Sequence, residues 1–148
     1  MRQIWIGLLA LVLTGCSSSL VDYSPQGITE PEAHAVIEQM ILAQPGQLRP
    51  DSVYIDNHYM GFNDPGAAGV PVTPAAEGTA ARNDKRIYFN SIASVQLYQL
   101  FNRYTVQLFD ADGQALIGFA SESQGQAQRF IDALQFYRNQ APATDGLN

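Results

Sequence analysis

The fold is decided by residues 104–119, which read YTVQLFDADGQALIGF. From Tyr104, apolar side chains occupy every second position and polar ones lie between them, which is typical of a strand with one buried face. Residues 110–113 (DADG) then form a turn, with a glycine that can take the positive φ of a tight hairpin. Apolar alternation resumes at Ala115. The stretch therefore predicts two antiparallel strands joined by a short turn.

The segment after this hairpin predicts an amphipathic helix. Ser121 and Ser123 can each cap its N-terminus, and Ser121 with Gln124 has the spacing of a capping box. Apolar residues then recur at helical spacing, and we expect this face to lie across the preceding strands. The face consists of Ala127, Phe130, Ile131, Leu134 and Tyr137.

Two further strands are predicted before the hairpin, at residues 86–90 and 94–100, so the fold class is α+β with an antiparallel meander closed by a helix. The pattern is carried by residues 87–89, 95–100, 104–109, 116–120 and 130–137. It resembles the latter half of pleckstrin-homology-like domains. The resemblance covers under half of the chain and implies a partly open barrel. The alternative is a simple sheet packed on two helices.

An N-terminal helix is indicated by Thr29 as N-cap, Glu32 as its capping-box partner and Pro31 in the first turn. Pro45 and Gly46 end it. Its expected core-facing stripe is Ala33, Val36, Ile37, Met40 and Ile41.

The rest of the single domain, expected over residues 28–140, is less regular. Residues 52–62 fit either a hairpin turning at residues 56–57 or one bent strand. Residues 63–84 have almost no large apolar side chains and predict a mobile loop. Residues 141–148 predict a disordered tail.

The N-terminus predicts export. Arg2 precedes an apolar run at residues 4–13, which is far short of the roughly 20 residues that span a bilayer. Leu13, Thr14 and Gly15 then lead into Cys16, the only cysteine of the chain. This order is that of a secretory signal with a cleavage site, expected over residues 1–15, and not of a transmembrane helix.

The sequence Leu13-Thr14-Gly15-Cys16 resembles the lipobox of bacterial lipoproteins; the alternative is an ordinary secretory signal that ends near a cysteine. The resemblance implies a diacylglyceryl group on the Cys16 sulfur and a further acyl chain, such as palmitate, on its amine. With Ser17 next, it implies the outer membrane, on the periplasmic face. The inner membrane and the cell surface are the alternatives. Residues 16–27 then predict the lipidated cysteine and a flexible tether.

Composition excludes one class of partner and the motifs favour no enzyme. The chain has 148 residues, with 8 Lys and Arg against 14 Asp and Glu, a balance that does not suit nucleic acid. His34 and His58 lack metal-ligand spacing, and Asp110 begins a turn rather than a calcium loop. No Gly-x-Ser-x-Gly elbow or phosphate-binding loop occurs. We therefore expect no metal, no cofactor and no catalysis.

The expected function is a non-catalytic binding or assembly module, held to a membrane by its acyl chains and bound to an envelope protein. An envelope hydrolase with a dispersed active site and a small-ligand carrier are the alternatives. Tyrosine suits interfaces because its ring is apolar and its tip polar. The candidate partner surface combines an aromatic group and a basic group: Tyr88, Tyr98, Phe101, Tyr104, Arg82, Lys85 and Arg86.

Overall fold

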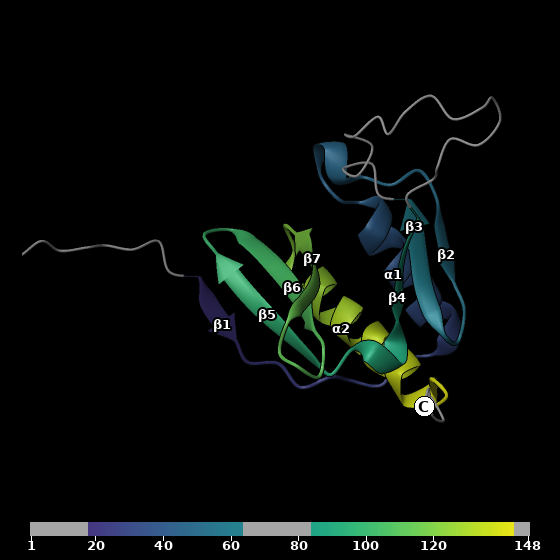
Figure 1. Cartoon of the computed structure of the whole chain (residues 1–148). Coiled ribbons are helices and arrows are strands. Elements are labelled where there is room, and N and C mark those ends of the chain that lie inside the picture. The colour runs from purple at the N-terminus through teal and green to yellow at the C-terminus, as the bar shows by residue number, and fades with distance from the viewer. Residues whose placement is uncertain (1–17, 64–83, 144–148) are drawn as a thin grey trace, which may run out of the picture.

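The computed structural model describes residues 18–63 and 84–143. Over these residues the protein is an α+β fold of two helices and two antiparallel sheets, with no closed barrel (Figure 1). The predicted class is confirmed, with an N-terminal helix and a C-terminal helix packed on a sheet. Among the described helices, none is long and apolar enough to cross a membrane.

Three predictions fall largely outside the described residues. The signal sequence and Cys16 precede Ser18, most of the predicted loop lies at residues 64–83, and most of the predicted tail lies at residues 144–148. Lipidation, the mobile loop and the disordered tail therefore stay predictions.

The four-stranded sheet contains the strands that the sequence predicts most clearly. Its order is β1 (Ser19–Val21), β5 (Ser94–Leu100), β6 (Arg103–Phe109) and β7 (Ala115–Ser121). β6 and β7 are the expected hairpin. In its turn, the Asp110 carboxylate accepts hydrogen bonds of 2.9 Å from the N–H groups of residues 112 and 114. Asp110 therefore closes a turn, as predicted.

The three-stranded sheet has the order β2 (Val53–Ile55), β3 (Tyr59–Asn63) and β4 (Asp84–Tyr88). Of the two alternatives for residues 52–62, the hairpin is correct. The strand expected at residues 86–90 belongs to this sheet, where it pairs with β3, and not to a meander with residues 94–100.

The chain leaves the three-stranded sheet at Phe89, because this side chain turns into the core. This residue begins the 3-10 helix η3 (Phe89–Ser91), and its buried ring stacks on Tyr137 with the ring centroids 4.8 Å apart. Turning Phe89 into the core ends β4 and carries the chain across to β5. This packing is why the strands form two sheets rather than one meander.

Helix α1 (Glu30–Leu42) begins as predicted. The carboxylate of Glu32 accepts hydrogen bonds from the backbone N–H and the hydroxyl of Thr29, at 3.4 and 3.0 Å. Pro31 lies in the first turn, where its missing N–H has no helical partner to lose.

Helix α2 (Gln124–Gln140) has Ser123 as its N-cap, because the Ser123 hydroxyl accepts a 3.3 Å hydrogen bond from the Gln126 N–H. The expected capping box between Ser121 and Gln124 is wrong, because Ser123 and not Ser121 is the N-cap. The Ser121 hydroxyl instead donates to the side-chain oxygen of Gln126, at 2.9 Å. All five predicted core residues of this helix are buried.

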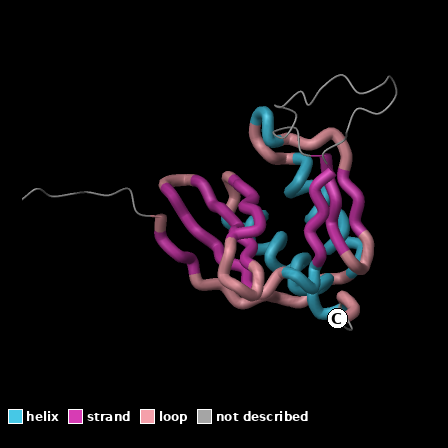
Figure 2. Tube along the Cα trace, in the orientation of Figure 1, coloured by secondary structure: helices cyan, strands magenta, loops and turns pink. Residues whose placement is uncertain are grey.

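The core lies between the two sheets and the two helices (Figure 2). In Figures 1 and 2, α2 crosses the four-stranded sheet, and α1 lies between α2 and the three-stranded sheet. Phe119 of β7 joins these layers. Its ring centroid is 5.1 Å from that of Phe130 on α2 and 6.1 Å from that of Phe62 on β3.

The tether expected at residues 17–27 is wrong for the described part of that segment. β1 pairs with β5, and the residues after β1 lie along α2. The Asp132 carboxylate accepts hydrogen bonds from the Tyr23 hydroxyl, at 2.9 Å, and from the Gln26 N–H, at 2.7 Å. The segment has the polar composition of a linker, but these two hydrogen bonds hold it to α2.

Gln44 covers the free edge of β7. Its side-chain oxygen accepts from the Ala120 N–H at 3.0 Å, and its side-chain nitrogen donates to the carbonyl oxygens of Ala120 and Met40, at 3.1 and 2.8 Å. Gln44 is 7% exposed. At Ala120, this amide side chain thus makes the two hydrogen bonds that a neighbouring strand would make.

Gln44→Ala is expected to lower the free energy of unfolding by about 2 kcal/mol, because it leaves the part-buried N–H and carbonyl groups of Ala120 without these partners. Chemical denaturation measures this change. Gln39→Ala, at an exposed position of α1, is the matched control and should stay within about 0.5 kcal/mol of wild type. Equal midpoints for the two variants would show that Gln44 has no role at this edge.

Candidate functional site

Three tyrosines and one arginine form a cluster on the outer surface of the three-stranded sheet, which we call the tyrosine face: Tyr54, Tyr59, Tyr88 and Arg86. The ring centroid of Tyr59 is 5.6 Å from that of Tyr54 and 5.3 Å from that of Tyr88. The Arg86 guanidinium carbon lies 5.3 Å from the Tyr59 ring centroid, a cation–π distance.

Strand register explains the cluster. Tyr59 pairs with Tyr88, and Gly61 pairs with Tyr54 on one side and Arg86 on the other. Paired residues share a face of the sheet, so all five positions face away from the core.

Gly61 has no side chain to fill the centre of the tyrosine face. A Cβ at this position would lie 3.3 Å from a ring carbon of Tyr59, which is a tight contact. The missing side chain therefore leaves a hollow beside the Tyr59 ring.

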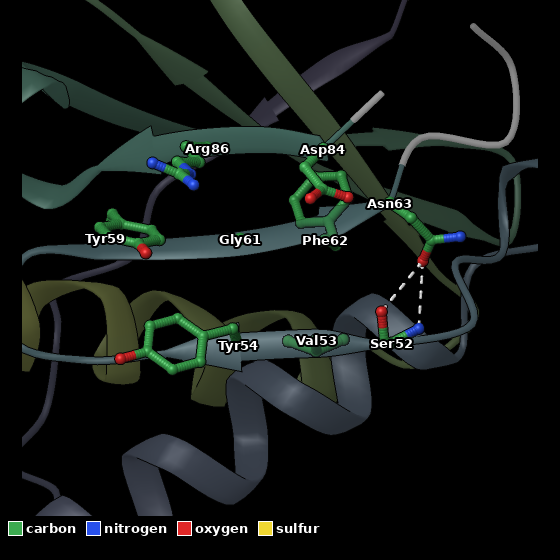
Figure 3. A pocket seen from close by; sticks show the side chains of 9 residues that line it. All are labelled: Ser52, Val53, Tyr54, Tyr59, Gly61, Phe62, Asn63, Asp84 and Arg86. Atoms are coloured by element: carbon green, nitrogen blue, oxygen red, sulfur yellow. Dashed lines mark hydrogen bonds between the residues drawn. The ribbon is translucent and has the colours of Figure 1, made fainter. Parts of the chain in front are cut away.

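The hollow is a groove of about 280 Å³ (Figure 3). Tyr54, Tyr59 and Arg86 lie at one end of it, and Asn63 and Asp84 at the other. At the polar end, the Asn63 side chain is held in place because its oxygen accepts hydrogen bonds from the N–H groups of residues 51 and 52, at 2.9 and 3.1 Å. The groove thus offers aromatic surface and a guanidinium at one end and amide and carboxylate groups at the other.

Asp56 shapes the turn beside the aromatic end. Its carboxylate accepts hydrogen bonds from the N–H groups of His58 and Tyr59, at 2.7 and 2.9 Å. Desolvation raises the pKa of Asp56, but these two hydrogen bonds and the nearby His58 outweigh it, so the pKa lies below its usual value. The negative charge of Asp56 in turn raises the pKa of Tyr54. A tyrosine with its ordinary pKa of about 10 is already protonated at neutral pH, so the Tyr54 hydroxyl can donate a hydrogen bond.

The structure divides the predicted basic group. Arg86 lies on the tyrosine face, but its neighbour Lys85 points the other way, because successive strand residues face opposite sides. The Lys85 ammonium donates instead to the Leu116 carbonyl, at 3.5 Å. Arg82 lies outside the described residues.

The predicted aromatic group is also divided. Tyr88 is part of the tyrosine face, whereas Tyr98, Phe101 and Tyr104 belong to the four-stranded sheet and its β5–β6 turn. Tyr104 packs against the core, and the Tyr98 hydroxyl bonds to Gln96. The aromatic residues that sequence analysis grouped therefore do not form one surface.

Sequence analysis missed Tyr54 and Tyr59, because the hairpin over residues 52–62 was left open. If the hairpin is assumed, the apolar Val53 and Ile55 face the core, and Tyr54 between them must face outward.

Among the described residues that line it, the groove has one carboxylate, that of Asp84, and neither histidine nor cysteine. His34 and His58 are both exposed. Within residues 18–63 and 84–143, no three His, Cys, Asp or Glu side chains come together as metal ligands would. The chemistry available at this face is aromatic contact, hydrogen bonding and ion pairing.

Comparison with protein-family models, with curated proteins and with solved structures finds no match for this chain.

Proposed function

We propose that the protein is a lipid-anchored binding module of the bacterial cell envelope, and that the tyrosine face is its binding surface. The anchor would be the acylated Cys16, in the outer membrane and facing the periplasm. Leu13-Thr14-Gly15-Cys16 supports the anchor, and the tyrosine face supports the binding role. The described lining of the groove has a single carboxylate and no histidine or cysteine to pair with it for acid–base work, which supports a non-catalytic role.

The observation that carries the binding role is the exposure of the aromatic rings. Tyr54 is 57% and Tyr88 is 45% exposed, although both rings would contribute more to folding if they were buried. Tyrosine and arginine are also the side chains that most often dominate the energy of protein interfaces. The face therefore has the composition of an interface centre, and its rings are already packed on one another.

The chemistry of the face indicates a protein partner. Arg86 has no ion-pair partner among the described residues, so its guanidinium is available to a carboxylate of the partner. The hollow over Gly61 has room for one apolar side chain beside Tyr59. We propose an envelope protein that presents an acidic and an apolar side chain close together.

Photo-crosslinking in intact cells tests this role. With p-benzoylphenylalanine at Tyr54 or Tyr88, we expect a covalent adduct with one envelope protein. The same group at Glu38, an exposed residue of α1, should give none. Arg86→Glu should reduce the adduct about tenfold, as expected for an interface centre. Arg49→Glu makes the same charge change at an exposed residue that does not line the groove, and should have no effect.

Equal adducts from all three positions, or an adduct that is unchanged by Arg86→Glu, would contradict the proposal. An adduct with glycan and not with protein would support the tyrosine face as a binding surface but contradict the proposed protein partner.

A further inference from the structure

Three exposed apolar side chains gather at one end of the four-stranded sheet: Leu20, Leu100 and Phe101, which we call the apolar tip. They are 63%, 42% and 76% exposed. They make up half of the large hydrophobic residues that are exposed in the described part of the chain. Leu20 pairs with Tyr98, two residues before Leu100 on the same face of β5, and Phe101 follows in the turn.

The same end of the sheet is where the chain arrives from Cys16. Ser19 pairs with Gln99, so the antiparallel register brings Ser18 opposite Leu100. Two residues separate Cys16 from Ser19. Even fully extended, that connection spans only about 11 Å between Cα atoms. Acyl chains on Cys16 would therefore leave the domain beside the apolar tip.

Phe101 holds a backbone conformation that the two-residue turn requires but that a phenylalanine adopts at a cost. Its φ is 55°, in the left-handed region where a bulky side chain is disfavoured and where glycine is usual at the start of a two-residue hairpin turn. Its ring is the most exposed of the large hydrophobic side chains in the described residues. The strained backbone thus presents an aromatic ring to the surroundings, a combination that points to a functional role.

The charges around the tip suit a lipid surface. Arg103 pairs with Leu100 across the turn and is exposed, so its guanidinium can reach a lipid phosphate. The nearest carboxylate in the register is that of Glu122, which the β6–β7 pairing places beside Arg103 on the side away from Leu100. No ion pair joins Arg103 to Glu122 among the described residues, so the guanidinium stays available to a phosphate. An aromatic ring, aliphatic side chains and a cation together are the composition that seats a protein in the membrane interface.

We infer that the apolar tip inserts into the lipid–water interface next to the acylated Cys16, and so fixes how the domain sits on the membrane. This inference rests on the proposed lipidation of Cys16. Figure 1 shows the tip and the three-stranded sheet on opposite sides of the domain. Insertion of the tip therefore directs the tyrosine face away from the bilayer, where a partner can reach it.

Tryptophan fluorescence tests the inference, because the only tryptophan of the chain is Trp5, which signal cleavage would remove. Phe101→Trp gives the mature protein one reporter at the tip, and Leu100→Trp gives a second. Tyr88→Trp places a matched aromatic reporter on the opposite side. Each full-length variant is purified from cell envelopes and reconstituted into vesicles containing phospholipids with brominated acyl chains, and co-flotation is measured in parallel.

Both tip reporters should emit at shorter wavelength than Tyr88→Trp and lose at least about half of their emission to the bromines, as expected for rings buried in the acyl boundary. Tyr88→Trp should be unaffected. Variants that co-float with the vesicles while the tip reporters behave like Tyr88→Trp would overturn the insertion and leave the anchor standing. Variants that fail to co-float would overturn the anchor and the insertion together.

Discussion

Cys16→Ser is expected to remove the protein from the membrane fraction, or to leave it there only as a precursor with its signal uncleaved. A serine offers no thiol for the diacylglyceryl group that the lipobox resemblance implies. Each buried CH₂ contributes about 0.8 kcal/mol, and two acyl chains already anchor a protein stably. Losing them should shift nearly all of the processed protein to the soluble fraction, as measured by fractionation and immunoblotting.

Ser18→Ala is the control for this variant, because it changes a neighbouring residue and keeps the cysteine. Its distribution should equal that of wild type. The apolar tip alone is not expected to hold the Cys16→Ser protein, since three side chains bury far less than the acyl chains do. Processed Cys16→Ser protein that stays with the membrane would contradict the anchor.

Asp132→Ala is expected to lower the free energy of unfolding by about 3 kcal/mol, because it removes a buried acceptor and leaves the part-buried Tyr23 hydroxyl and Gln26 N–H without it. Asp132 is 1% exposed and binds the Tyr23 hydroxyl, the Gln26 N–H and the Arg129 guanidinium. Burial and the Asp132 hydrogen bond raise the pKa of Tyr23, so its hydroxyl remains a donor at neutral pH. Chemical denaturation measures the loss.

Asp112→Ala makes the same change at an exposed turn residue whose side chain has no hydrogen bond among the described residues. It should stay within about 0.5 kcal/mol of wild type. If the two variants unfolded at the same denaturant concentration, Asp132 would not be holding the N-terminal segment.

The Asp132 contact also links the fold to the proposed orientation. Without it, residues 22–27 lose their attachment to α2 and become the longer tether that their composition suggests. Hydrogen exchange at residues 19–26 should then increase while exchange in β6 stays slow.

Much of the fold could be predicted because local signals and the fold agree. The alternation from Tyr104, the Asp110 turn and the apolar face of α2 each correspond to an element in the structure. The capping residues Thr29 and Glu32 mark the start of α1 to the residue.

The remaining features depend on contacts between residues far apart in the chain. β1 has only three residues and forms because β5 offers it an edge. The segment after it is held by Asp132, more than 100 residues away, and a polar residue on α2 gives no sign of such a contact in the sequence. The tyrosine face likewise requires the pairing of β3 with β4, across residues 64–83.

Mass spectrometry of the mature N-terminal peptide, taken from protein extracted from cell envelopes, tests the central claim most directly. The account predicts a peptide that begins at Cys16 and carries a diacylglyceryl group on sulfur and an acyl chain on the amine. A peptide that begins at Cys16 with a free thiol, or one that still contains Trp5, would contradict it.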